Sequence, residues 1–216
     1  MGNLKCSEKE SLEFDEAEHI YKWNGCRVRS VTQIIKDAGL IDDTWFTEFA
    51  RERGKAVHKA IFLDIMGDLH FDSLHPVVKP YIEGWIEFKA FSRIKTIPEY
   101  CEHRGYNPIH DYAGTMDVFC ILNGRHSIIE NKTGDEKYSH LQTAAYANIP
   151  EIAAFAPERF LLRLKPKVMP ALKPFTYPND FDQFIFYMNK TKEEIWNLKQ
   201  STLNTSDAED LTALSL

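Results

Sequence analysis

The stretch GTMDVFCILNGRHSIIENKTG, residues 114–134, decides the fold. It contains two apolar runs joined by Asn123-Gly124, the dipeptide most typical of a two-residue β-hairpin turn. Apolar residues occupy both faces of the two predicted strands, which is typical of a sheet that is covered on both sides. We therefore expect this hairpin to lie inside an α/β domain and its strand ends to carry a functional site.

Charged residues interrupt the same hairpin. A two-residue loop pairs Leu122 with Arg125, and this register brings Asp117 opposite Glu130 with Cβ atoms about 5 Å apart. Lys132 points to the same face. Two carboxylates at this separation repel by roughly 3 kcal/mol at an effective dielectric constant near 20, and a divalent cation between them removes that cost. Oxygen ligands suit Mg²⁺ or Mn²⁺. The alternative interpretation is an exposed hairpin with an ordinary Glu–Lys pair.

Composition sets outer limits on the function. The chain has 216 residues, of which 44% are hydrophobic, and this is enough for one domain with a sizeable core. The net charge of -6 argues against a global positive field for nucleic acid, although a few placed cations can still contact phosphates. The sequence has no apolar signal region or membrane-length apolar run, so we expect an intracellular, cytoplasmic protein without a membrane partner.

Turn and cap residues predict the remaining elements of a single domain over residues 1–200, followed by a polar, flexible tail over 201–216. Asn24-Gly25 predicts an N-terminal hairpin. Ser30 and Ser139 are predicted helix caps. Helices are expected over residues 30–39, 47–67, 81–94, 139–149 and 180–200. Strands are expected over 97–107 and 158–166, and the proline-rich stretch 165–180 is expected to be a loop.

The hairpin motif resembles the signature of the PD-(D/E)XK nuclease superfamily. That signature is an Asp followed on the next strand by (D/E)-x-K, here Asp117 and then Glu130-Asn131-Lys132. Asn131 departs from the pattern, because this position is commonly apolar in the family. The motif alone is weak evidence, so the resemblance depends on further elements in the right order.

Those elements are similar to the RecB-like branch of the superfamily, which includes phage exonucleases. Gly54 to His58 match its Gly-x-x-x-His helix segment, Glu102 matches an upstream Glu, and Gln142 with Tyr146 match a Gln-x-x-x-Tyr helix. The resemblance covers roughly residues 30–165. It implies a restriction-endonuclease-like core with a central mixed sheet flanked by helices. The cysteine ligands of the iron–sulfur members are absent, so no iron–sulfur cluster is expected.

The same resemblance implies an activity. It implies a Mg²⁺- or Mn²⁺-dependent deoxyribonuclease that hydrolyses DNA phosphodiester bonds as an exonuclease in recombination or repair. DNA is the implied substrate. The resemblance also implies that the chain can form a homo-oligomer and can act with a recombination partner protein. An endonuclease or junction resolvase of this fold is a close alternative, and a catalytically inactive nucleic-acid-binding or assembly module is a more distant one. The sequence contains no HExxH, GxSxG or Walker A motif of other hydrolases.

The resemblance also assigns metal ligands. Asp117 and Glu130 would bind the metal with the backbone carbonyl of Asn131. His58 would add a ring nitrogen, or else be a packed helix histidine. Glu102 is a weaker candidate, either a ligand through water or an exposed strand residue, and Glu99 is the other carboxylate in its segment.

Catalytic and DNA-contacting roles fall to other polar residues. Lys132 would orient or deprotonate the attacking water, or stabilise charge on the phosphate. Gln142 and Tyr146 lie four residues apart on one helix face and would hold a backbone phosphate or the base beside the scissile bond; the alternative is that Tyr146 is a core residue. The basic residues that are candidates for DNA phosphate contacts are Arg51, Lys55 and Lys137.

Overall fold

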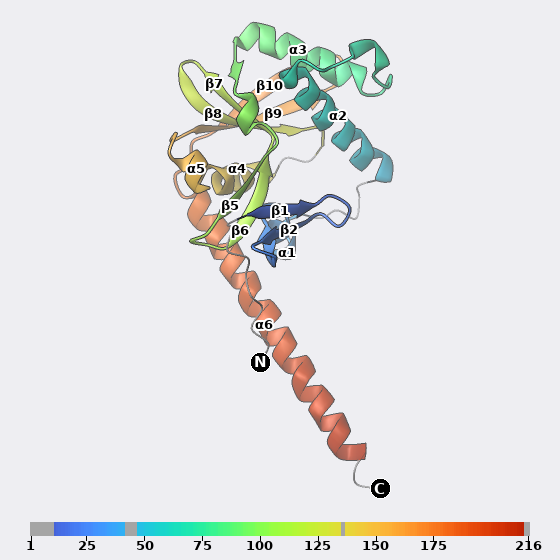
Figure 1. Cartoon of the computed structure of the whole chain (residues 1–216), viewed down its shortest axis with the longest axis vertical. Helices are drawn as coiled ribbons and strands as arrows, with labels where there is room; N and C mark the ends of the chain where they lie inside the picture. The colour runs from blue at the N-terminus through green and yellow to red at the C-terminus, as the bar shows by residue number, and fades with distance from the viewer. Residues whose placement is uncertain (1–10, 42–46, 135–136, 214–216) are drawn as a thin grey trace.

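The computed structural model describes residues 11–41, 47–134 and 137–213. The described chain is a mixed α/β fold with two mixed β-sheets and six α-helices. Figure 1 shows the sheets and the shorter helices gathered in one body, from which the last helix, α6 (Asp180–Ala213), extends. The α/β class predicted from the sequence is therefore confirmed.

The main sheet contains the central hairpin and has the strand order β10-β9-β8-β7-β4. Strands β8 and β9 are parallel, and the other neighbouring pairs are antiparallel. The strands are β4 (Lys95–Thr96), β7 (Val118–Leu122), β8 (Arg125–Lys132), β9 (Glu158–Lys165) and β10 (Val168–Phe175).

A second sheet has the order β1-β2-β3-β6-β5, with β3 and β6 parallel. Its strands are β1 (Leu12–Asp15), β2 (Ile20–Trp23), β3 (Cys26–Ser30), β5 (His103–Asn107) and β6 (Tyr112–Met116). The sequence predicted one central sheet, and this expectation was too simple. The chain bends at Asp117, between β6 and β7, and passes there from the second sheet into the main sheet.

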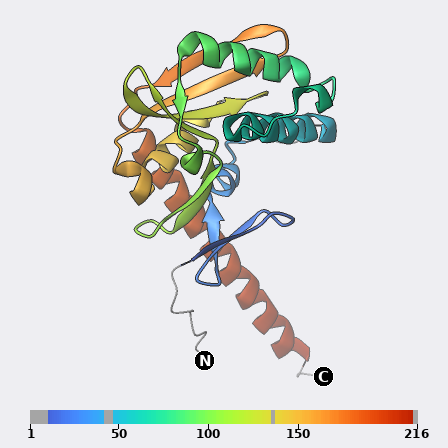
Figure 2. The same cartoon turned by 45° about the horizontal axis from the view of Figure 1, so that its top comes forward.

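Helices cover both faces of the main sheet, as the apolar hairpin predicted (Figures 1 and 2). Helices α2 and α3 pack on one face, where Val118, Cys120 and Ile129 point. Helices α1, α4 and α6 pack on the other face, where Phe119 and Ile128 point. The helices before α6 are α1 (Val31–Asp37), α2 (Glu48–Met66), α3 (Lys79–Ser92), α4 (Ser139–Ala147) and the short α5 (Pro150–Ala153).

The register of the central hairpin is the predicted one. Leu122 pairs with Arg125, and the pairing continues to Val118 with Ile129. Asn123 and Gly124 have φ angles of 50° and 81°, which a type I′ turn requires. The ladder ends at Val118, so Asp117 and Glu130 are not a cross-strand pair, and the bend frees the Asp117 side chain for other contacts.

Two local predictions concern helix caps. The Ser30 hydroxyl accepts a hydrogen bond from the Gln33 N–H at 3.0 Å, so this predicted cap is confirmed. Ser139 is the first residue of α4 rather than its cap, because Tyr138 occupies the cap position and the Ser139 hydroxyl is buried.

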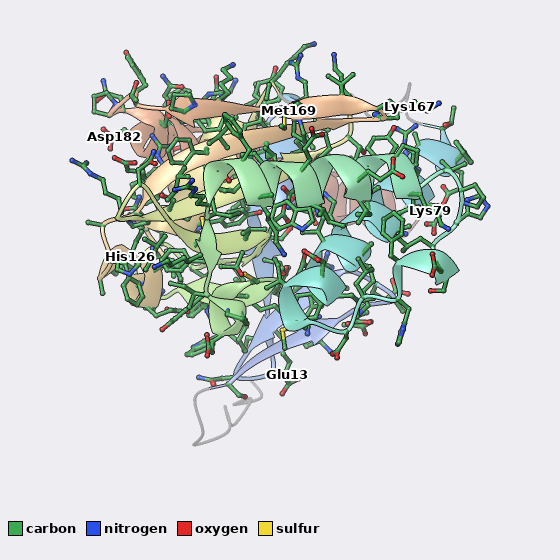
Figure 3. The ribbon with its side chains drawn as sticks, turned by 90° about the horizontal axis from the view of Figure 1, so that it is seen from above. Glu13, Lys79, His126, Lys167, Met169 and Asp182 are labelled. Atoms are coloured by element: carbon green, nitrogen blue, oxygen red, sulfur yellow. The ribbon has the colours of Figure 1, made fainter. Side chains whose placement is uncertain are left out.

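The predicted loop over 165–180 is wrong in its first half. Strand β10 occupies Val168–Phe175 and includes Pro170 and Pro174. Proline has no N–H to donate, and an edge strand that pairs on one side only tolerates this loss. β10 pairs only with β9 among the described strands, and its register shifts between Val168 and Ala171. Figure 3 shows Lys167 and Met169 on the β9–β10 hairpin, beside α3.

The ends of two other elements also differ from prediction. Residues 98–100 form a short 3₁₀ helix, η2 (Pro98–Tyr100), so the predicted strand over 97–107 begins only at His103. A second 3₁₀ helix, η1 (Phe71–Ser73), precedes α3. Helix α6 continues through Ala213, where the sequence predicted a polar tail. Within the described residues, no helix combines the length and the apolar character that a membrane span needs.

The first prediction concerns Gly114 in β6. A Cβ atom at this position would lie 2.6 Å from Tyr146 Cε1 and 3.0 Å from Val31 Cγ2. Both neighbours are buried, so we expect Gly114→Ala to destabilise the fold by about 1–3 kcal/mol through overpacking. Chemical denaturation measures this change.

Gly54 in α2 is the matched control. A Cβ atom there meets only Thr133 Oγ1 at 3.6 Å, which is ordinary van der Waals contact. Gly54→Ala should therefore stabilise the helix by about 0.5–1 kcal/mol. Equal effects of the two substitutions would show that Tyr146 does not pack closely against β6.

Candidate metal centre

Three ligand-type side chains from distant parts of the chain meet at the Asp117 bend. His58, Glu102 and Asp117 each offer one atom, and these atoms lie within 4.8 Å of one another. Opposite ligands of Mg²⁺ lie about 4.2 Å apart, because each bond is about 2.1 Å long. A small closure of the triad therefore gives the spacing of a divalent-cation site.

Asp117 is held from two sides. Its Oδ2 accepts a hydrogen bond from the Asn131 backbone N–H at 2.7 Å, which ties the bend to β8. Its Oδ1 lies 3.3 Å from His58 Nδ1, on α2. Asp117 is buried, and the His58 side chain is 28% exposed. The acid is thus fixed in place, while the imidazole faces the open side of the site.

Glu102 occupies a strained backbone position. It immediately precedes β5 and has a φ angle of +50°, in the left-handed region that non-glycine residues rarely adopt. Its N–H donates a hydrogen bond to the Asp117 carbonyl oxygen at 2.9 Å, which holds it in this conformation. Such strain costs on the order of 1–3 kcal/mol and is concentrated at functional sites. Glu102 was predicted to lie on a strand, but it lies in the turn before β5, which the sequence did not predict.

Glu130 and Lys132 form a second, adjoining pair. Lys132 Nζ donates a hydrogen bond to Glu130 Oε1 at 2.7 Å. Glu130 is only 3% exposed, and its Oε2 has no hydrogen-bond partner among the described residues. A buried carboxylate oxygen without a partner is costly, and a cation nearby would offset that cost. The buried acid therefore fits a cation-binding site, although Glu130 is not one of the three clustered side chains.

The ionisable side chains of the site shift one another's pKa values. Burial opposes protonation of His58, but the Asp117 carboxylate outweighs it and raises the pKa of His58 to about 9. Burial and then the charge of Asp117 raise the pKa of Glu102 to about 7 and also raise the pKa of Glu130. Burial of Asp117 is outweighed mainly by His58, so the pKa of Asp117 is lowered. Protons thus balance negative charge that a cation could balance instead.

The triad and the Glu130–Lys132 pair line one cavity of about 820 Å³. Most residues that the sequence singled out reach it. The predicted site residues that line the cavity are Gly54, Lys55, His58, Glu102, Asp117, Glu130, Lys132, Gln142 and Tyr146. These residues come from α2, the turn before β5, the Asp117 bend, β8 and α4.

Gln142 and Tyr146 form the α4 wall of the cavity. Both are buried, and Tyr146 also belongs to the hydrophobic core beneath α4. The close approach of its ring to Gly114 keeps this wall next to β6. The two interpretations of Tyr146, core residue and site residue, are therefore compatible.

The remaining predicted site residues are not among the described residues that line this cavity. Arg51 lies on α2 and is 3.6 Å from Glu48, and Lys137 precedes α4. Glu99 is exposed on η2. Asn131 contributes its N–H to Asp117, and the role of its carbonyl as a ligand stays a prediction.

Sequence reasoning missed one wall of the cavity. Phe14, Glu16, His19 and Tyr21 line it from the β1–β2 hairpin, and Arg104 lines it from β5. The aromatic residues before Asn24-Gly25 were a visible signal, but a hairpin motif does not indicate what the hairpin faces.

No family model matches the chain, and a search of curated proteins finds no significant match. The functional argument therefore depends on the geometry of the site and on its chemistry.

The second prediction concerns Glu102 as a metal ligand. We expect the protein to bind Mn²⁺, measured by isothermal titration calorimetry. We expect Glu102→Gln to weaken this binding by about 10-fold or more, since even residues that only support metal ligands contribute that much.

Glu99→Gln is the matched control, because Glu99 is an exposed carboxylate three residues away and outside the cavity. Its Mn²⁺ affinity should equal that of the wild type. If Glu130→Gln lowered the affinity and Glu102→Gln did not, the Asp117–Glu130 pair expected from the sequence would be the ligand pair.

Proposed function

We propose that this protein is a Mg²⁺- or Mn²⁺-dependent deoxyribonuclease that hydrolyses DNA phosphodiester bonds as an exonuclease. One observation carries the proposal: a triad of ligand-type side chains and a lysine paired with a buried glutamate line the same cavity. Such a combination is what metal-assisted phosphodiester hydrolysis requires.

His58, Glu102 and Asp117 would hold the cation. Their mixed nitrogen and oxygen donors are compatible with Mn²⁺, and the two carboxylates also suit Mg²⁺. When bound there, the cation would act as a Lewis acid, which lowers the charge on the scissile phosphate and makes water a stronger nucleophile. The hydrogen bond from Asn131 to Asp117 orients this ligand in the way that outer-shell groups do at metal sites.

Lys132 would act on the reacting groups directly. Its ammonium group lies beside Glu130 Oε1 and lines the cavity, so it can donate a hydrogen bond to a phosphate oxygen or to the attacking water. Glu130 holds the Lys132 side chain in this position. Stabilising charge that develops in the transition state is the larger contribution expected of such a group.

The surroundings of the site suit a phosphate backbone. Gln142 and Tyr146 line the cavity from α4 and carry groups that can form hydrogen bonds. Lys55 and Arg104 line two other walls as cations, each also paired with an exposed glutamate. The protein as a whole is acidic, with a net charge of -6. Attraction of DNA would therefore be local to the cavity rather than a property of the whole surface.

Two separate arguments support the proposal. The order of motifs along the sequence resembles RecB-like nucleases of the PD-(D/E)XK superfamily. The convergence of His58, Glu102, Asp117 and Lys132 in space comes from the fold and does not follow from their order alone. An exonuclease of this kind would work in recombination or repair, with a recombination protein or further copies of itself as partners.

The third prediction tests the activity. End-labelled linear DNA and closed circular DNA are incubated with Mg²⁺, Mn²⁺ or EDTA, and the products are separated on a gel. Linear DNA should be degraded with either metal, and circular DNA should remain intact. Cleavage of the circles would indicate an endonuclease or resolvase, and intact DNA in every reaction would favour an inactive nucleic-acid-binding module.

The fourth prediction concerns Lys132. Lys132→Ala should lower turnover by about 10²-fold or more and change DNA binding much less, because its contribution arises mainly in the transition state. Turnover and affinity are measured separately in single-turnover experiments. Lys132→Arg tests whether charge alone suffices, since guanidinium differs in shape and does not act as a base.

Lys165→Ala is the control for this pair of variants, because Lys165 is an exposed lysine at the end of β9, outside the cavity. It should behave as the wild type. A thermal melt of Lys132→Ala shows whether the protein still folds when Glu130 has lost the lysine that pairs with it. Wild-type turnover in a folded Lys132→Ala protein would remove this residue from the mechanism.

A further inference from the structure

The β1–β2 hairpin presents an aromatic wall, defined by Phe14, His19 and Tyr21, to the cavity of the metal centre. The ring centroids of Phe14 and Tyr21 are 4.5 Å apart, and those of Phe14 and His19 are 5.0 Å apart. The hairpin lies across from α2 in Figures 1 and 2, and residues of both elements line the cavity.

The aromatic wall is firmly attached to the second sheet. The Tyr21 hydroxyl lies 2.6 Å from Thr115 Oγ1, which is within hydrogen-bond distance. Thr115 belongs to β6. The Arg104 guanidinium stacks over the Phe14 ring at 4.5 Å and pairs with Glu16 at 3.0 Å. These contacts join the hairpin to β5 and β6, so the wall keeps a fixed position beside the triad.

His19 is the exposed ring of this wall. It ends the turn before β2 with a φ angle of +54°, a left-handed conformation that asparagine or glycine adopts at lower cost. Its ring meets Phe14 edge-on, at an interplanar angle of 85°. The His19 ring also lies edge-on to the buried Tyr21, with centroids 6.2 Å apart, and it is exposed where it lines the cavity.

Two lysines of α2 form a basic wall of the same cavity. Lys55 and Lys59 are exposed, lie four residues apart on one side of α2 and line the cavity. Lys55 Nζ also pairs with Glu52 Oε1 at 2.7 Å, an exposed ion pair that a phosphate can replace at little cost. Burial and then the positive charge of Lys55 lower the pKa of His19. The lining of the cavity thus combines the aromatic wall, the basic wall and the buried acids Asp117 and Glu130, and we call this cavity the slot.

We propose that this slot admits a single DNA strand, with a base stacked on the aromatic wall at His19 and phosphates on Lys55 and Lys59, so that the enzyme acts on unpaired ends. The proposal rests on the proposed nuclease function. Aromatic side chains beside a basic groove are the common means of binding single strands without sequence preference.

Burial of the acids favours a single strand over a duplex. Asp117 is 8% exposed and Glu130 is 3% exposed, so a scissile phosphate has to enter the slot to reach them. In a duplex the bases stay paired and stacked, and proteins that bring a base into a pocket have to unpair it first. An unpaired end enters without that cost.

The experiment measures DNA binding in EDTA by fluorescence polarisation, where metal-dependent hydrolysis does not occur. A labelled 12-nucleotide strand is compared with a blunt duplex of the same sequence. We expect the wild type to bind the single strand at least about 10-fold more tightly. His19→Asn fits the left-handed backbone and lacks the aromatic ring, and it should lose about 5- to 10-fold in single-strand affinity.

His70→Asn is the matched control, because His70 is an exposed histidine outside the cavity. Its affinity should equal that of the wild type. Lys59→Ala should reduce the slope of log affinity against log salt concentration for single-strand binding by about 0.7. Lys192→Ala, on the exposed side of α6, should leave this slope unchanged.

Two results would overturn the inference: equal or tighter binding of the duplex, or unchanged single-strand affinity in a folded His19→Asn protein. Either result leaves the nuclease proposal intact if linear DNA is still degraded with Mg²⁺ or Mn²⁺. Conversely, if the protein prefers single strands but hydrolyses no DNA, the proposed nuclease activity is rejected and the slot remains as a site that binds single strands.

Discussion

The hydrogen bond from the Asn131 N–H to the Asp117 carboxylate is the interaction on which the rest of the structure depends. It fixes the bend where the chain leaves β6 in one sheet and begins β7 in the other. The same bend directs the Asp117 carbonyl oxygen towards the Glu102 N–H and the Asp117 side chain towards His58. One residue thus joins the two sheets and positions the two other members of the triad.

The sequence predicted best what short-range chemistry determines. Asn123-Gly124 fixed the register of the central hairpin, and Ser30 fixed the start of α1, because each acts on its immediate neighbours. The position of Glu102 was mispredicted because its left-handed backbone is held by a hydrogen bond to a residue that is distant in sequence. β10 was mistaken for a loop because prolines exclude a central strand but not an edge strand.

The site also shows why motif order and site geometry give different sets of candidate ligands. In the linear motif, Asp117 and Glu130 are the acidic pair, whereas in space the clustered acids are Asp117 and Glu102. Extending the ladder by one pair would have placed Glu130 opposite Asp117, but the ladder ends one residue earlier and Lys132 binds Glu130 instead. The β1–β2 hairpin was predicted as an element, and its place beside the cavity depends on the parallel pairing of β3 with β6, which no local pattern encodes.

The edges of the main sheet have a consequence for self-association. A sheet edge with free N–H and C=O groups can pair with a strand of another molecule and start aggregation. At one edge, β10 carries Pro170, Pro174 and a register shift, which interrupt the row of donors. At the other edge, β4 is only two residues long, Lys95–Thr96. Both edges therefore offer few evenly spaced donors and acceptors with which a strand of another molecule could pair. This disfavours aggregation of the protein through the edges of its main sheet.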